Sequence, residues 1–168
     1  MRFAFVLAAI GTLYAQDVPT WGGLTFGMAE AQARLVLGAK MVKPDPGAEH
    51  QPVDQSSGNV VMGVVRETSV KGFDGEASLL FDKGSKKLSM VTLMLTPQKD
   101  LSNQAKTEAF SRLHSDLVKK YGPPVSVTDN TILFRCGGQS IDVFATLAKD
   151  VPLLVHIAYE PTSAAKGV

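Results

Sequence analysis

The stretch from Trp21 to Gly38, WGGLTFGMAEAQARLVLG, joins an extended lead-in and a glycine turn to one short amphipathic segment. Its apolar spacing predicts a helix over residues 29–37. Gly38 supplies the left-handed conformation that commonly ends a helix. The apolar side chains expected on the buried face of this helix follow the i, i+3, i+7 rule: Met28, Ala31 and Leu35.

A second helix is predicted over residues 102–121, and it also ends at a glycine, Gly122, before two prolines. Two oppositely charged pairs at i, i+4 spacing, Glu108–Arg112 and Asp116–Lys120, are expected on its outer side. The expected buried stripe consists of Phe110, Leu113, Leu117 and Tyr121.

Each predicted helix is followed by strand-like segments. Short turns between them, such as Gly137-Gly138, predict antiparallel pairing. The predicted fold class is α+β, in which two units (21–96 and 100–160) each place a helix before antiparallel strands, with both helices packed on one side of the sheet. The expected strands cover 60–70, 76–81, 88–96, 125–128, 131–136, 139–147 and 153–160.

The first residues have the pattern of an export signal. Arg2 precedes an apolar run of 11 residues, 3–13, and Ala15 offers a small residue for cleavage before Gln16. A membrane span would need about 20 residues. We therefore expect a signal peptide over 1–15, and an uncleaved anchor is the alternative. No cysteine follows the run, so the predicted product is periplasmic or secreted and not a lipoprotein.

The remaining chain suits one domain over 16–160, with a small-residue tail over 161–168 predicted to be disordered. Without Arg2, the basic and acidic residues balance at 16 each. This balance gives no reason to expect binding to nucleic acid or to an anionic membrane. The single cysteine, Cys136, cannot form an internal disulfide, and its alternation with Phe134 predicts a core-facing thiol.

Residues 39–59 have no apolar period and contain three prolines, so they are predicted to form a long loop. The loop is either a surface connection or a binding segment that includes His50. A second candidate binding surface is the non-core face of the predicted sheet, which would carry Met90, Thr92, Met94 and Phe144.

The same non-core face would carry an alternative site. If the last strands pair as their turns predict, Asp142 becomes a diagonal neighbour of both Arg135 and His156. A carboxylate beside a histidine can orient the imidazole for base chemistry, as a small hydrolase would require. Charge pairing on a solvated sheet is the simpler interpretation. No nucleophile motif, metal-ligand spacing or phosphate-binding loop is present, so we predict no catalytic residue, metal or cofactor.

The residues from Gly27 to Gly38 also carry a family resemblance. Gly27, Met28, Ala33, Leu37 and Gly38 fit a GM-x(4)-[VA]-x(3)-LG pattern. In this the chain resembles the SmpA/OmlA outer-membrane assembly lipoproteins and the β-lactamase-inhibitor-protein-like repeats of small exported bacterial proteins. The resemblance implies a helix-packed antiparallel sheet that binds protein partners.

Three functions follow as expectations. The first is a non-enzymatic binding or assembly module that contacts an envelope protein. The second is a binder of a small molecule or lipid, which would need a cavity between the helices and the sheet. The third is a small hydrolase that uses Arg135, Asp142 and His156.

Overall fold

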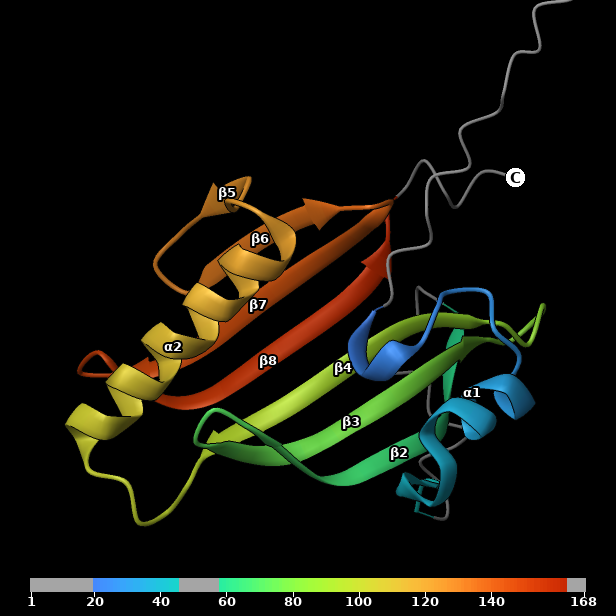
Figure 1. The fold of residues 1–168 in the computed structure, drawn as a ribbon, viewed down its shortest axis with the longest axis horizontal. Helices are drawn as coiled ribbons and strands as arrows, with labels where there is room; N and C mark the ends of the chain where they lie inside the picture. Colours follow the sequence, from blue (N-terminus) through green and yellow to red (C-terminus); the bar gives the residue numbers. More distant parts are fainter. Residues whose placement is uncertain (1–19, 46–57, 163–168) are drawn as a thin grey trace, which may run out of the picture.

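The computed structural model describes residues 20–45 and 58–162. Their strands form one eight-stranded sheet with the order β1-β2-β3-β4-β8-β7-β6-β5 (Figure 1). The strands are β1 (Met41–Val42), β2 (Asn59–Val70), β3 (Phe73–Asp82), β4 (Leu88–Pro97), β5 (Ser126–Val127), β6 (Thr131–Cys136), β7 (Gln139–Ala148) and β8 (Val151–Pro161).

The predicted α+β fold of two helix-then-strand units is wrong. The described chain is mostly β, a single antiparallel sheet with two short α-helices. β4 and β8 pair directly, with Leu93 opposite Ile157, and this pairing makes the sheet continuous. Two separate small sheets would each leave open strand edges, whose backbone groups the β4–β8 pairing satisfies.

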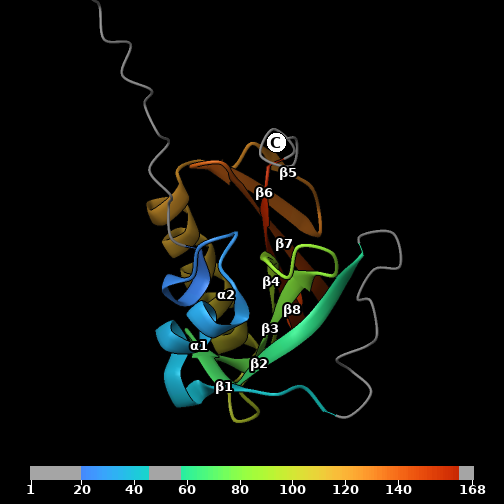
Figure 2. The same cartoon turned by 90° about the vertical axis from the view of Figure 1, so that its right-hand side faces the viewer.

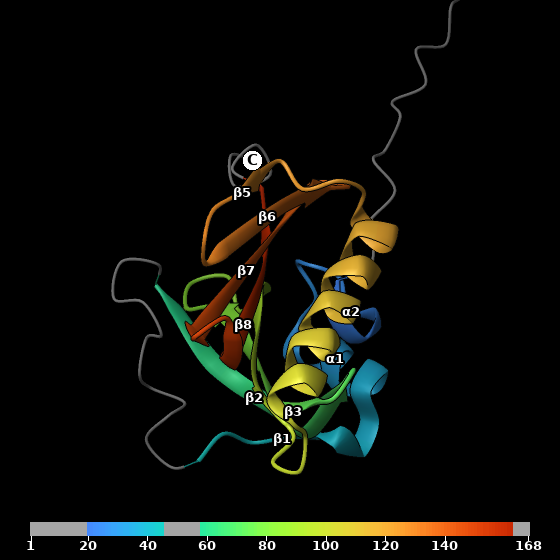
Figure 3. The ribbon, with the colours of Figure 1, turned by 90° about the vertical axis from the view of Figure 1, so that its left-hand side faces the viewer.

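Both helices lie on one face of the sheet (Figures 2 and 3). A short 3-10 turn, η1 (Trp21–Gly23), lies between them on the same face. Strand residues alternate between this face and the far face, as the two-residue period of a strand requires. The predicted core-facing residues of the last three strands face the main core: Phe134, Ile141, Val143, Val155, Ile157 and Tyr159 are buried in it, and Ile132 packs against it partly buried.

Helix α1 (Glu30–Leu37) begins after Ala29, whose N–H donates to Gln32 Oε1 at 2.8 Å. It is followed by the 3-10 turn η2 (Gly38–Lys40). The predicted buried face is wrong, because Leu35 is 86% exposed whereas Ala33 is fully buried. The predicted spacing counted Met28 as part of the helical stripe. Its carbonyl instead accepts from Leu88 N–H at 2.8 Å, so Met28 belongs to an extended segment.

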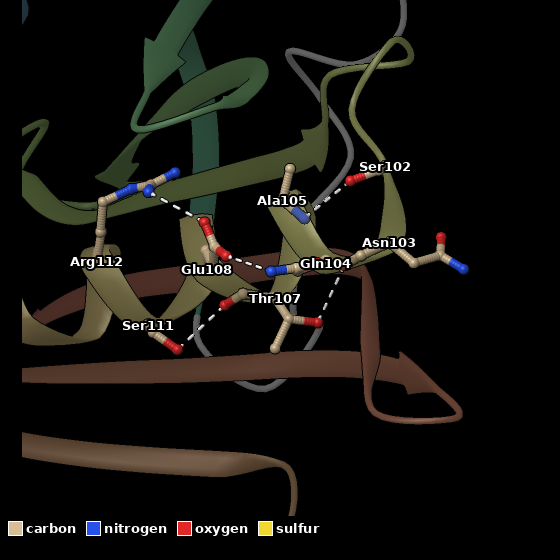
Figure 4. Close-up of polar contacts among 8 residues, drawn as sticks. All are labelled: Ser102, Asn103, Gln104, Ala105, Thr107, Glu108, Ser111 and Arg112. Atoms are coloured by element: carbon tan, nitrogen blue, oxygen red, sulfur yellow. Dashed lines mark hydrogen bonds and ion pairs between the residues drawn. The ribbon is translucent and has the colours of Figure 1, made fainter.

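Helix α2 (Asn103–Tyr121) is capped by Ser102, whose Oγ accepts from Ala105 N–H at 3.2 Å (Figure 4). Gly122, with φ of 85°, ends the helix as predicted. The predicted buried stripe is confirmed for Leu113, Leu117 and Tyr121, with Ala109 added and Phe110 only partly buried.

Two predicted irregular segments are more ordered than expected. β1 lies inside the predicted loop, where Met41 is buried opposite Val65. Two apolar residues are too short a pattern to predict a strand. β1 forms because these residues pair with the edge of β2. At the other end, Pro161 belongs to β8, and Thr162 N–H donates to Gly138 O at 2.9 Å. Residues 46–57 of the predicted loop and 163–168 of the predicted tail, together with the predicted signal peptide, lie outside the described residues.

The far face carries a second, smaller apolar cluster. Leu80, which lies between the core residues Leu79 and Phe81, points to this face and is 1% exposed. It packs with Val61, Val64 and Met90. Neither helix among the described residues is long and apolar enough to cross a membrane.

Candidate functional site

The residues predicted to bind on the sheet surface lie on the far face, opposite the helices. Met94 on β4 and Phe144 on β7 are both direct partners of His156 on β8. Both are 44% exposed. Thr92 is only 7% exposed, and Met90 is partly buried against the second cluster, so both expose less of their side chains than Met94 and Phe144 do. His50 lies outside the described residues.

The alternative site, formed by Arg135, Asp142 and His156, lies on the same face and includes the histidine that pairs with Met94 and Phe144. Asp142 is opposite Ala158, whereas His156 is opposite Phe144, so the carboxylate and imidazole are diagonal neighbours, as the sequence predicted. Arg135 is opposite Ser140 and is likewise diagonal to Asp142. The expected juxtaposition therefore exists on the far face.

The electrostatics of the alternative site reflect burial more than pairing. Burial raises the pKa of Asp142, and Arg135, Ser140 and His156 partly oppose that shift. Burial also lowers the pKa of His156, and Asp142 opposes it. Both groups thus lose hydration without gaining a dominant partner. Ser140 is the nearby hydroxyl, and it lies beside the carboxylate rather than opposite the imidazole. This geometry lacks the nucleophile–base–orienter order of hydrolytic triads.

A pocket lies between α2, the sheet and η1. We call it the aromatic pocket, and its volume is about 140 Å³. Three aromatic side chains contribute to its wall, together with aliphatic and charged groups. It is lined by Trp21, Val70, Lys71, Leu93, Leu113, Asp116, Leu117, Lys120, Tyr121, Ile157 and Tyr159.

Local structure brings distant segments to this pocket. The η1 turn that carries Trp21 is closed by Thr20, whose N–H and hydroxyl both donate to Leu24 O, at 2.8 and 3.1 Å. The β2–β3 turn brings Lys71 to the pocket, and in this turn Lys71 and Gly72 have φ of 52° and 89°. Two successive positive φ values produce the tight hairpin that right-twisted strands favour.

Two tyrosines form the polar part of the pocket wall. Tyr121 and Tyr159 are 5% and 4% exposed, and their ring centroids are 6.3 Å apart. Burial raises the pKa of Tyr121, and Tyr159 adds to that shift. The two side chains are neighbours, but none of the residues that the structure describes makes a hydrogen bond of good geometry with the buried Tyr121 Oη. An unpaired buried hydroxyl costs roughly 1–3 kcal/mol and calls for an explanation.

A second hollow lies between α1 and β2. It is larger, about 340 Å³, and its wall includes Arg34, Lys43, Lys83 and Lys86. The three lysines are exposed, and Arg34 is already paired with Glu30 at 2.8 Å. Solvent therefore screens these charges.

The described residues contain no group of three or more His, Cys, Asp or Glu side chains that could hold a metal ion. Cys136 packs against the main core as predicted. His114 lies at the core edge, with its ring centroid 6.3 Å from that of Phe134.

Comparison with known proteins adds no assignment. No family model matches the chain, and neither a curated protein nor a solved structure matches it. The resemblance of residues 27–38 to exported bacterial families therefore stays a prediction. What the structure defines is a class, a mostly-β protein whose single sheet is covered by helices on one face and has a small pocket beneath them.

Sequence reasoning missed the aromatic pocket as a set of residues. Leu113, Leu117 and Tyr121 were predicted to be core residues, and nothing in their spacing distinguishes a filled core from a pocket. Trp21 gave no stronger signal, since a single tryptophan beside glycines can equally pack on the core, as it partly does.

Proposed function

We propose that this protein is a non-enzymatic binding protein that holds a small apolar molecule in the aromatic pocket. The observation that carries the proposal is a pocket of about 140 Å³ with Trp21, Tyr121 and Tyr159 in its wall. Ligand pockets are typically apolar and aromatic, with a few polar groups that fix orientation. The aromatic pocket has this composition.

The volume limits the size of the ligand. An apolar protein cavity of about 150 Å³ is large enough to bind benzene. Drug-sized ligands and whole lipids occupy pockets of roughly 300–1,000 Å³. The proposed ligand is therefore a molecule with one ring or a short acyl chain, rather than an intact lipid.

The chain contains a single tryptophan, so the indole N–H of Trp21 gives one resolved NMR signal at the pocket wall. Benzyl alcohol and benzoate are titrated separately into the full chain. A saturable shift of the indole signal with either compound supports the proposal. The proposal fails if neither compound shifts the signal.

A pocket-filling variant gives the matching control. Leu113→Phe adds volume to the pocket wall and should abolish the shift, while Leu153→Phe adds the same volume at a residue that is 51% exposed and outside the pocket. Overpacking costs typically 1–3 kcal/mol, so the NMR spectrum of Leu113→Phe must first be checked for a retained fold.

Export to the periplasm or the medium is part of the proposal, and the apolar run over 3–13 after Arg2 supports it. The protein recovered from the exported fraction should begin at Gln16. Recovery of a chain that still begins at Met1 would contradict removal of a signal peptide.

A second candidate function is docking of an envelope protein on the far face of the sheet. The register places Glu76, Met94, His156, Phe144 and Thr131 in one row across five strands. Its centre holds an exposed methionine and an exposed phenylalanine, and a charged side chain lies at one end. Protein interfaces commonly combine methionine and aromatic side chains at the centre with a polar rim.

A photocrosslinker at position 144 tests this second candidate in the native envelope. Specific docking gives one dominant protein adduct that disappears when Met94→Glu is added. The control position is 125, where the native valine is 58% exposed and lies outside the row. Equal crosslinking from both positions would remove the docking proposal.

A further inference from the structure

The charged groups of the aromatic pocket identify the chemistry of its ligand more closely. Three are present: Lys71, Asp116 and Lys120. Asp116 Oδ2 lies 3.0 Å from Lys71 Nζ, so its carboxylate is already paired. Lys120 makes no ion pair with any residue that the structure describes.

The position of Lys120 is defined by packing. Its Nζ lies 4.8 Å from the centroid of the Tyr121 ring, within cation–π range. Burial of part of the side chain lowers the pKa of Lys120, although the residue as a whole remains exposed. The pocket therefore combines an apolar wall with one lysine that makes no ion pair with a described residue and is held against the Tyr121 ring.

Resting on the function proposed above, we propose that the aromatic pocket binds a small monocarboxylic acid, with its apolar body between α2 and the sheet and its carboxylate on the Lys120 ammonium. The charges around the pocket sum to one net positive charge, which a single carboxylate neutralises. Aromatic side chains on more than one side favour a ring as the apolar body.

The shape and the charge of a ligand can be separated without changing the protein. Benzoate and benzamide have nearly the same shape, but only benzoate carries a negative charge. With the indole signal of Trp21 as the readout, benzoate is expected to bind about twofold to fivefold more tightly, the range of a partly exposed ion pair. Hexanoate serves as a second acid and reports whether the ring is preferred over a short acyl chain.

Variants then assign the preference to one ammonium group. Lys120→Gln should remove the preference for benzoate, whereas Lys119→Gln, at the neighbouring lysine that does not line the pocket, should retain it. Asp116→Asn removes the competing carboxylate and should strengthen benzoate binding.

The outcomes separate this inference from the proposed function. Equal affinity for benzoate and benzamide, or a preference that survives Lys120→Gln, overturns the carboxylate assignment but leaves a pocket that binds apolar molecules. Tighter binding of hexanoate than of benzoate overturns the choice of a ring. If benzoate, benzamide and benzyl alcohol all leave the indole signal unshifted, the proposed function fails as well.

Discussion

Asp116 on α2 pairs with Lys71, which lies on the β2–β3 turn, at 3.0 Å, and not with Lys120 one helical turn away. The i, i+4 pair expected from the sequence therefore does not form. The other expected pair, Glu108–Arg112, is present at 3.8 Å (Figure 4). Because the hairpin tip packs on α2, Asp116 has a tertiary partner, and Lys120 is left at the pocket.

The first prediction concerns the conformation of Lys71. Lys71 and Lys149 have φ of 52° and 50°, which glycine adopts at less cost than lysine. Lys149→Gly should raise the free energy of unfolding by roughly 0.5–1 kcal/mol. Lys71→Gly should gain less, because it also loses the pair with Asp116. Urea denaturation of both variants measures the difference, and an equal gain would mean that the pair contributes nothing.

A second prediction concerns the buried hydroxyl of Tyr121. Tyr121→Phe removes an unpaired polar atom and keeps the ring, so the free energy of unfolding should stay the same or rise by about 1 kcal/mol. Thermal and urea unfolding both report this quantity. A loss of more than about 1 kcal/mol would mean that Tyr159 or a bound water makes a stabilising hydrogen bond with the hydroxyl.

The third prediction compares two glycines in the sheet. A Cβ on Gly75 would collide with the backbone carbonyl of Met94, whereas a Cβ on Gly63 would meet the flexible end of the Met41 side chain. Backbone cannot move without breaking the β3–β4 pairing. Gly75→Ala should therefore cost roughly 2–4 kcal/mol, and Gly63→Ala clearly less. Chemical denaturation measures the free energy of unfolding of both variants. A smaller loss for Gly75→Ala than for Gly63→Ala would contradict the close approach of the Met94 carbonyl.

A fourth prediction concerns pH. Burial holds the pKa of His156 in the folded chain below the ordinary value of 6.5. As the pH falls through this value, the unfolded chain takes up a proton that the folded chain does not, so the free energy of unfolding decreases. His156→Gln should reduce the loss of stability between pH 7.5 and 5.5.

Urea titrations at the two pH values, on the wild type and His156→Gln, measure this effect. The contribution of Asp142, whose pKa burial raises, is present in both proteins and largely cancels in the comparison. An identical loss of stability in the two proteins would show that His156 does not cause the pH dependence.

Local patterns predicted most of the elements, and they failed where a pattern was short or mixed. The helix over 102–121 and the strands around Gly137-Gly138 formed as expected, because a long stripe and a tight turn are properties of neighbouring residues. The buried face of α1 was wrong because Met28, counted as helical, pairs with β4 instead. β1 was missed because its pairing with β2 depends on an edge 20 or more residues away.

The sequence by itself determined which segments become the two α-helices and most of the strands, and it placed Arg135, Asp142 and His156 on one face, because strand alternation and turn length fix those features locally. Only the tertiary structure decided that β4 pairs with β8 in a single sheet and that Trp21 comes to lie beside Tyr121. It also assigned Asp116 to Lys71. These contacts join residues far apart in the chain, where packing and backbone pairing, rather than spacing, select the partner.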